Sequence, residues 1–145
     1  MNVSKAIVCT PAHSFAEGIT TATEGKPDIQ KTLKQHQAYV DLLSKLGVKV
    51  TVLPAQENYP DSTFVEDPAV ILKQVAVITN PGAESRTGET KVIRKALEPI
   101  YTNIHEIKSP GTLDGGDVFE VGDHLYIGLT ERTNQAGAEQ LCQIA

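Results

Sequence analysis

Acidic and arginine side chains recur at related positions in this chain. The stretch DSTFVEDPAV, residues 61–70, carries three acids among residues typical of a buried strand. A carboxylate in such surroundings costs free energy unless a cation pairs with it. Further along, Arg86 and Arg132 each stand directly before a threonine. The recurrence defines a set of candidate site residues: Asp61, Glu66, Asp67, Asp114 and Asp117, with Arg86 and Arg132.

Two explanations fit this set. Arginine forks bind carboxylates bidentately, and paired acids bind guanidinium or ammonium groups. A pocket with both signs therefore suits a zwitterionic small molecule with an additional cation, such as arginine. Alternatively, the acids and arginines pair with one another and only stabilise the fold. The DGGD stretch at 114–117 also has two explanations: a turn that enters a strand, or a site where Asp114 orients a base or a substrate nitrogen.

The remaining titratable side chains form no recognisable motif. The histidines are His13, His36, His105 and His124, and none has the spacing of a metal-binding pair. We therefore expect no metal, and we assign no histidine to catalysis. Cys9 and Cys142 form no CxxC motif. They are expected to be reduced thiols of a cytoplasmic protein, and neither is predicted to be a nucleophile.

Composition limits the class of partner. With 145 residues, 40% of them hydrophobic and 21% charged, the chain fits one globular domain. A formal net charge of -5 argues against nonspecific binding to nucleic acid or to an anionic membrane, since both require basic patches. No stretch is long and apolar enough for a membrane span, and the first residues do not resemble a signal peptide. A small molecule is the expected partner.

The elements before residue 61 follow from local patterns. Residues 5–9 are predicted to form a buried strand, and residues 48–53 a second strand. Between them, apolar residues at helical spacing predict a helix that is capped by Asp28 and ended by Gly47. The segment 11–27 has no period, and connections of this length are often functional.

From residue 61 the chain repeats one supersecondary unit, over approximately 61–110 and 111–145. The first copy is predicted to contain strands at 64–72 and 75–80, a helix near 88–98 and a closing strand at 104–107; the second contains strands at 115–122 and 125–130 and a helix from 134. Thr87 and Thr133 are expected to cap the two helices. Asp67 and Asp117 are expected early in the first strand of each copy.

The second copy has no closing strand, and a repeat unit buries its apolar face only against a neighbour. An open edge is therefore expected. Either a second copy of the chain covers it in a homodimer, or the 145 residues are part of a longer protein.

Several separate motifs also carry a family resemblance. PAHSFAEGITT, PDSTFVEDPAV, ITNPGAESRTGET and SPGTLDGGDVFEVGDHLYIGLTERTNQAGAEQ together resemble the dimethylarginine dimethylaminohydrolase family of guanidino-modifying enzymes. The resemblance implies a five-bladed α/β propeller of ββαβ units, with about half of it in this chain. It also implies hydrolysis of dimethylarginine to citrulline and dimethylamine by a cysteine, a histidine and an acid, with no cofactor.

The resemblance assigns roles to individual positions. Asp67 and Glu66 match acids around the guanidinium group, and Asp61 matches an acid at the substrate's amino end. The arginines that hold the substrate carboxylate match Arg86 and Arg132, and Ile19 matches a lid-loop residue that contacts substrate through its carbonyl. Asp114 matches the acid beside the catalytic histidine, where the family often has glutamate.

The family's histidine lies in an LHLK-like stretch and its cysteine in a GGVSC-like stretch, and this sequence contains neither. The chain is therefore expected to supply substrate-binding residues and to be inactive alone, because the covalent route requires the nucleophile. The alternative is a noncatalytic arginine-binding or assembly module from a truncated gene.

Overall fold

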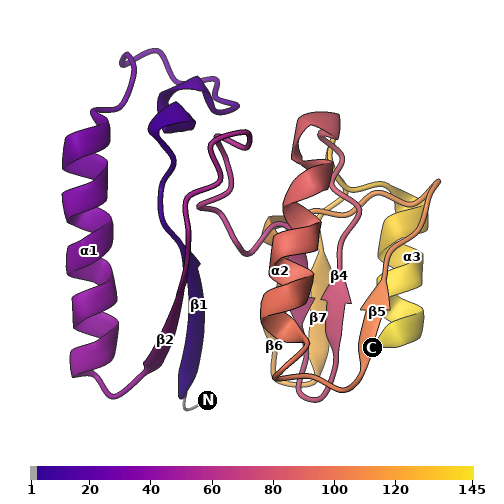
Figure 1. The fold of residues 1–145 in the computed structure, drawn as a ribbon. Helices are drawn as coiled ribbons and strands as arrows, with labels where there is room; N and C mark the ends of the chain where they lie inside the picture. The colour runs from indigo at the N-terminus through magenta and orange to yellow at the C-terminus, as the bar shows by residue number, and fades with distance from the viewer. Residues whose placement is uncertain (1–2) are drawn as a thin grey trace. The chain divides into compact units, whose positions relative to one another are not determined.

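The computed structural model describes residues 3–145 (Figure 1). The chain divides into two compact units, Met1–Val65 and Glu66–Ala145. Each unit contains strands and at least one helix, which confirms the predicted α/β class. Among the described residues the sheets are open, with two strands in the first unit and with three and two strands in the second. None of the helices in residues 3–145 is long and apolar enough to span a bilayer.

The first unit is a parallel β-α-β arrangement. Strand β1 (Lys5–Cys9) pairs in parallel with β2 (Lys49–Leu53), and helix α1 (Ile29–Lys45) connects them, since parallel neighbours require a crossover. The side chain of Asp28 accepts the N–H of Lys31 at 3.0 Å, which confirms the predicted cap. Gly47 follows the last turn with a φ of 83°, a conformation that favours glycine.

The long connection between β1 and α1 begins with the short 3-10 helix η1 (His13–Glu17). The backbone N–H of His13 donates to Glu57 Oε2 at 2.9 Å, and Ser14 Oγ donates to the carbonyl of Glu57 at 2.9 Å. His13 Nδ1 also lies 3.0 Å from Glu57 Oε1, and this contact lowers the pKa of Glu57. The start of the connection is therefore tied to the segment that follows β2.

The second unit contains the elements predicted for the two copies, although it begins at Glu66 and not at residue 61. In the first, β3 (Ala69–Ile71) pairs antiparallel with β4 (Ala76–Ile78), which pairs in parallel with β5 (Ile104–Glu106); η2 (Glu84–Glu89) and α2 (Thr90–Leu97) lie between β4 and β5. The second has η3 (Gly115–Asp117), β6 (Val118–Val121), β7 (His124–Ile127) and α3 (Gln135–Ile144). Every predicted strand and helix of the repeat is present, in a shorter form.

The predicted threonine caps are wrong. Thr87 lies inside η2, where its Oγ1 donates to the carbonyl of Glu84 at 2.9 Å, and α2 has no side-chain cap. Helix α3 is capped by Asn134, whose side chain accepts the N–H of Gly137 at 2.8 Å. The hydroxyl of Thr133 donates instead to Asp117 Oδ2 at 2.7 Å. Because the Thr133 hydroxyl is bound to Asp117, which is distant in the sequence, it does not cap the helix.

Both acids that were expected early in a strand lie just before it. Asp67 precedes β3 in a turn, and Asp117 is the last residue of η3, directly before β6. Strand pairing starts later than predicted in both copies, so neither carboxylate projects from a sheet face. Each carboxylate can therefore contact the turn that follows the second strand of its copy.

One apolar core joins the two copies. Its buried members are Val70, Val77, Ile107, Leu113 and Leu141. Partly buried residues of the β6–β7 hairpin pack against this cluster, and so do Leu72, Val75 and Ile144. The core therefore lies between sheet β3-β4-β5 on one side and α3 with the β6–β7 hairpin on the other (Figure 1). It holds the polar turns of the two copies at fixed positions.

Candidate functional site

Ile19 and Asp61 lie together in the first unit. Asp61 is buried, and its two carboxylate oxygens accept the backbone N–H of Ile19 at 3.2 and 3.1 Å. A Cβ atom at Gly18 would lie 2.5 Å from Asp61 Oδ1, so a glycine there permits this close approach. The acid thus fastens the loop by the backbone amide of Ile19, whose side chain is exposed. The resemblance pointed instead to the carbonyl of Ile19.

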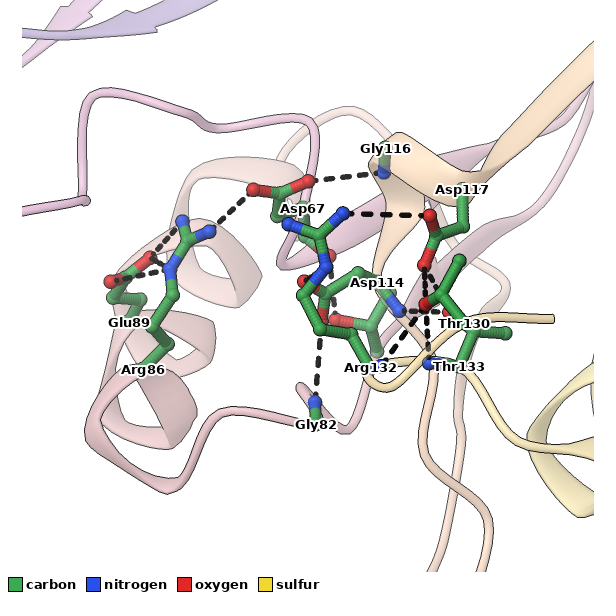
Figure 2. A network of polar contacts seen from close by, with 11 residues as sticks. Asp67, Gly82, Arg86, Glu89, Asp114, Gly116, Asp117, Thr130, Arg132 and Thr133 are labelled. Atoms are coloured by element: carbon green, nitrogen blue, oxygen red, sulfur yellow. Dashed lines mark hydrogen bonds and ion pairs between the residues drawn. The ribbon is translucent and has the colours of Figure 1, made fainter. Parts of the chain in front are cut away.

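Arg86 and Asp67 meet in the second unit (Figure 2). Arg86 Nη1 donates to Asp67 Oδ2, and the backbone N–H of Gly116 donates to Asp67 Oδ1 at 3.1 Å. Asp67 therefore has a partner on each oxygen, one from each copy of the repeat. A Cβ atom at Gly116 would lie 2.5 Å from Asp67 Oδ1, which explains why a glycine suits this position.

Glu89 is the second partner of Arg86, and the sequence reasoning missed it. Glu89 Oε1 accepts from Arg86 Nε at 3.0 Å, and Oε2 accepts from Nη2 at 2.7 Å. Both side chains are buried, with Arg86 only 7% exposed. The spacing of three residues was the available signal, because such pairs share one helix face. η2 and the start of α2 set this geometry.

The charge of Arg86 is stabilised inside the protein. Burial acts to lower its pKa, but the hydrogen bonds to Glu89 and Asp67 outweigh that effect and raise the pKa. Its Nε, Nη1 and Nη2 atoms each donate to a protein carboxylate. The internal-pairing explanation therefore describes Arg86 in this structure.

Arg132 is in a different environment. Its Nε lies 3.5 Å from Asp114 Oδ2, and its Nη2 lies 3.5 Å from Asp117 Oδ1. Charge-assisted hydrogen bonds are usually about 2.7–2.9 Å long, so both contacts are loose. The side chain is also 53% exposed. Arg132 can therefore exchange a protein acid for an anionic ligand at lower cost than Arg86 can.

Asp114 is fully buried at the centre of the network. Its N–H donates to Thr133 Oγ1 at 3.1 Å, and its Oδ1 accepts the N–H of Gly82 at 3.3 Å. Within residues 3–145, its Oδ2 has the loose contact with Arg132 and no hydrogen bond. Burial and the nearby charge of Asp67 raise the pKa of Asp114 above its usual range, against the opposing effects of Gly82, Arg132 and Arg86.

Glu66 is the predicted site residue of the second unit that does not take part in the network. Its side chain is exposed, and among the described residues its carboxylate makes no hydrogen bond or ion pair. The structure thus brings together Asp67, Asp114, Arg86 and Arg132 in the second unit, with Asp117 beside them. Ile19 and Asp61 form their own contact in the first unit.

The network in the second unit has an excess of acids. Among the described residues, the ion pairs of Asp67, Glu89, Asp114 and Asp117 are made with Arg86 and Arg132. Four carboxylates against two guanidinium groups favour the approach of a further cation, because like charges at short range repel one another. The part of the chain that the structure describes has no cluster of three histidine, cysteine or acidic residues suited to a metal ion.

Comparison with known proteins gives consistent matches. The family model described as N,N dimethylarginine dimethylhydrolase, eukaryotic, matches residues 11–145. The N(G),N(G)-dimethylarginine dimethylaminohydrolase of Pseudomonas aeruginosa is 47% identical over 139 residues, which cover 95% of this chain and 55% of the relative. The protein of the same name from Streptomyces coelicolor is 42% identical over 142 residues, which cover 97% of this chain and 55% of the relative. This chain therefore spans about half the length of these relatives.

Solved structures agree with the sequence matches. A cysteine-to-serine variant of the Pseudomonas aeruginosa protein, complexed with citrulline, matches with a TM-score of 0.95 and 46% identity, over 99% of this chain and 57% of that one. The N-terminal domain of a cyanobacterial arginine dihydrolase has a TM-score of 0.85 at 16% identity, over 99% of this chain and 55% of that one. That second likeness shows a shared α/β fold only.

Proposed function

We propose a function from the premise that this chain belongs to the dimethylarginine dimethylaminohydrolase family, whose model matches residues 11–145. The natural protein hydrolyses the guanidino group of N-methylated arginine and converts dimethylarginine to citrulline and dimethylamine. Residues 1–145 supply side chains that bind and orient this substrate. The two matched relatives are named for this activity, and one solved relative is complexed with citrulline.

The observation that carries the proposal is the excess of acids beside a half-exposed arginine. Asp67 and Asp114 offer carboxylates to a cationic guanidinium group, and Arg132 offers a fork to a carboxylate. A methylated arginine carries both groups on one flexible chain. Arg86 contributes through Asp67, whose carboxylate it orients, and Asp61 and Ile19 are proposed to meet the substrate's amino end. Glu66, next to Asp67 but exposed, stays a predicted substrate contact.

Asp114 is proposed to orient the catalytic histidine. Its burial and raised pKa are typical of catalytic carboxyl groups. Neither thiol of this chain is proposed as the nucleophile. Cys9 is buried, with its Sγ 3.4 Å from the carbonyl of Pro54, and Cys142 is exposed on α3. We therefore propose that the cysteine and histidine of the reaction lie outside residues 1–145, and that these residues alone bind substrate without turnover.

The five-bladed propeller is also a proposal, supported by one difference between the two hairpins. Val70 pairs with Val77 in the first hairpin, and Phe119 pairs with Tyr126 at the corresponding position of the second. The valines are covered by the core that joins the copies. The two aromatic rings stack with centroids 5.0 Å apart yet remain 59% and 50% exposed. A further unit of the same kind would cover them, as in a propeller.

An assay of the natural protein with asymmetric dimethylarginine tests the function. Citrulline and dimethylamine should appear in equal amounts, and replacement of Arg132 by glutamine should raise KM. Binding of methylarginine by calorimetry without any citrulline would instead favour a noncatalytic arginine-binding module. Absence of both binding and turnover would reject the proposal. A homodimer and a cytoplasmic location stay predictions.

A further inference from the structure

We propose that Asp117 and Thr133 are positioning residues that hold Arg132 and Asp114 in the geometry required for substrate binding and catalysis. This inference rests on the proposed function of those two partners. Neither Asp117 nor Thr133 needs to touch substrate, because each acts through a contact with its partner. The two residues come from different segments, η3 and the turn before α3.

Asp117 accepts the side-chain hydrogen bonds of the turn before α3. Its Oδ2 accepts the hydroxyl of Thr130 at 2.8 Å and the hydroxyl of Thr133 at 2.7 Å. Its Oδ1 lies 3.5 Å from Arg132 Nη2, and its side chain is nearly buried. One carboxylate therefore contacts three of the four residues from 130 to 133 (Figure 2).

Thr130 links the carboxylate of Asp117 to the backbone of the turn. Its Oγ1 accepts the N–H of Arg132 at 3.0 Å and the N–H of Thr133 at 3.1 Å while its proton goes to Asp117. The backbone position of Arg132 is thus fixed by a hydroxyl whose orientation the carboxylate determines. Loss of the Asp117 charge should free both the turn and the guanidinium group of Arg132.

Thr133 connects Asp117 to Asp114. Its hydroxyl donates to Asp117 Oδ2 and accepts the backbone N–H of Asp114 at 3.1 Å. The residue is fully buried, so water cannot replace its hydroxyl without a cavity. Removal of the hydroxyl leaves the N–H of Asp114 and an oxygen of Asp117 short of a partner. Asp114 should then hold the catalytic histidine less well.

These contacts predict different kinetic effects. Thr133→Val in the natural protein should lower kcat for dimethylarginine about tenfold with KM within about twofold, because a lost hydrogen bond near the reacting group costs roughly a factor of ten. Thr133→Ser keeps the hydroxyl and should stay within about twofold of the wild type. Asp117→Asn should mainly raise KM, again about tenfold, since the turn that fixes the backbone of Arg132 loses the carboxylate that accepts its two threonine hydroxyls.

Thr87→Val is the matched control. Thr87 also follows an arginine, but it is exposed and its hydroxyl donates only to the carbonyl of Glu84. This variant should keep both kinetic constants. Equal kcat values for Thr133→Val and Thr87→Val, or loss of activity in Thr133→Ser as well, would overturn the role of Thr133. An unchanged KM in Asp117→Asn would overturn the role of Asp117.

A measurement without turnover separates this inference from the proposed function. The Nε–Hε signal of Arg132 in the nuclear magnetic resonance spectrum can be assigned by its loss in Arg132→Lys. Asp117→Asn, or the milder Thr130→Val, should move this signal towards that of free arginine, whereas Thr87→Val should not. If the wild-type protein has no hydrolase activity, the proposed function is rejected but the positioning of Arg132 is not. An unmoved Arg132 signal in folded Asp117→Asn and Thr130→Val would reject the positioning.

Discussion

Replacement of Glu89 by alanine should destabilise the second unit strongly. Arg86 and Glu89 are both buried, and Glu89 supplies the acceptors for Arg86 Nε and Nη2 at 3.0 and 2.7 Å. Without Glu89, the guanidinium group keeps Asp67 but loses its partner on the other side. Breaking a buried ion pair from one side typically costs about 3–5 kcal/mol, and the remaining contact with Asp67 places this variant at the lower end of that range. We expect the free energy of unfolding to fall by this amount.

Urea unfolding followed by circular dichroism measures this change as a shift of the midpoint at constant slope. Glu106→Ala is the control, because Glu106 pairs with Arg94 where both side chains are partly exposed. Exposed pairs contribute about 0–1 kcal/mol, so the control should shift the midpoint little. High salt should leave the Glu89→Ala effect in place, since buried pairs are weakly screened. A loss no larger than that of Glu106→Ala would refute the reasoning.

Three further predictions concern the same unit. The raised pKa of Asp114 means that the folded state binds its proton more tightly than the unfolded state does, so this group lowers the stability of the wild type as pH rises from 3.8 towards the folded pKa. The stability of Asp114→Asn relative to wild type should therefore increase across that pH range. A constant difference would contradict the direction of the shift. Gly82→Ala would place a Cβ atom 2.4 Å from the backbone of Arg132, so KM should rise and the free energy of unfolding should fall by about 1–3 kcal/mol. Gly128→Ala is the control: its Cβ atom would lie 3.7 Å from the nearest neighbour, so this variant should be tolerated in the same assays. Asn134→Ala should cost about 1–2 kcal/mol in urea unfolding, because it removes the cap of α3 and the side-chain hydrogen bonds to the N–H of Thr112 and the carbonyl of Pro110. Asn134→Ser should restore the part due to the cap, and an unchanged midpoint in the alanine variant would show that these contacts do not contribute.

Local features of the sequence were sufficient for the elements. Asp28 begins α1 and Gly47 follows it as expected, because a cap is decided by a side chain and a backbone conformation within a few residues. The strands predicted at 5–9 and 48–53 are present as β1 and β2, and both hairpins of the predicted repeat are present. The motifs were also sufficient to predict the family, and the match over residues 11–145 confirms that prediction.

The partners of the site residues depended on the tertiary structure. Glu66 and Asp67 are neighbours in the sequence, yet one is exposed and the other is held by Arg86 and Gly116. Thr133 was predicted to be a helix cap, but the folding of the second copy brings Asp117 within 2.7 Å of its hydroxyl. The sequence by itself determined the acids, the arginines and the repeat that carries them. Only the tertiary structure decided which acid each arginine meets. The contacts of Arg86 with Asp67 and of Arg132 with Asp114 and Asp117 join residues that are distant along the chain, and they form only when the segments of one copy fold together.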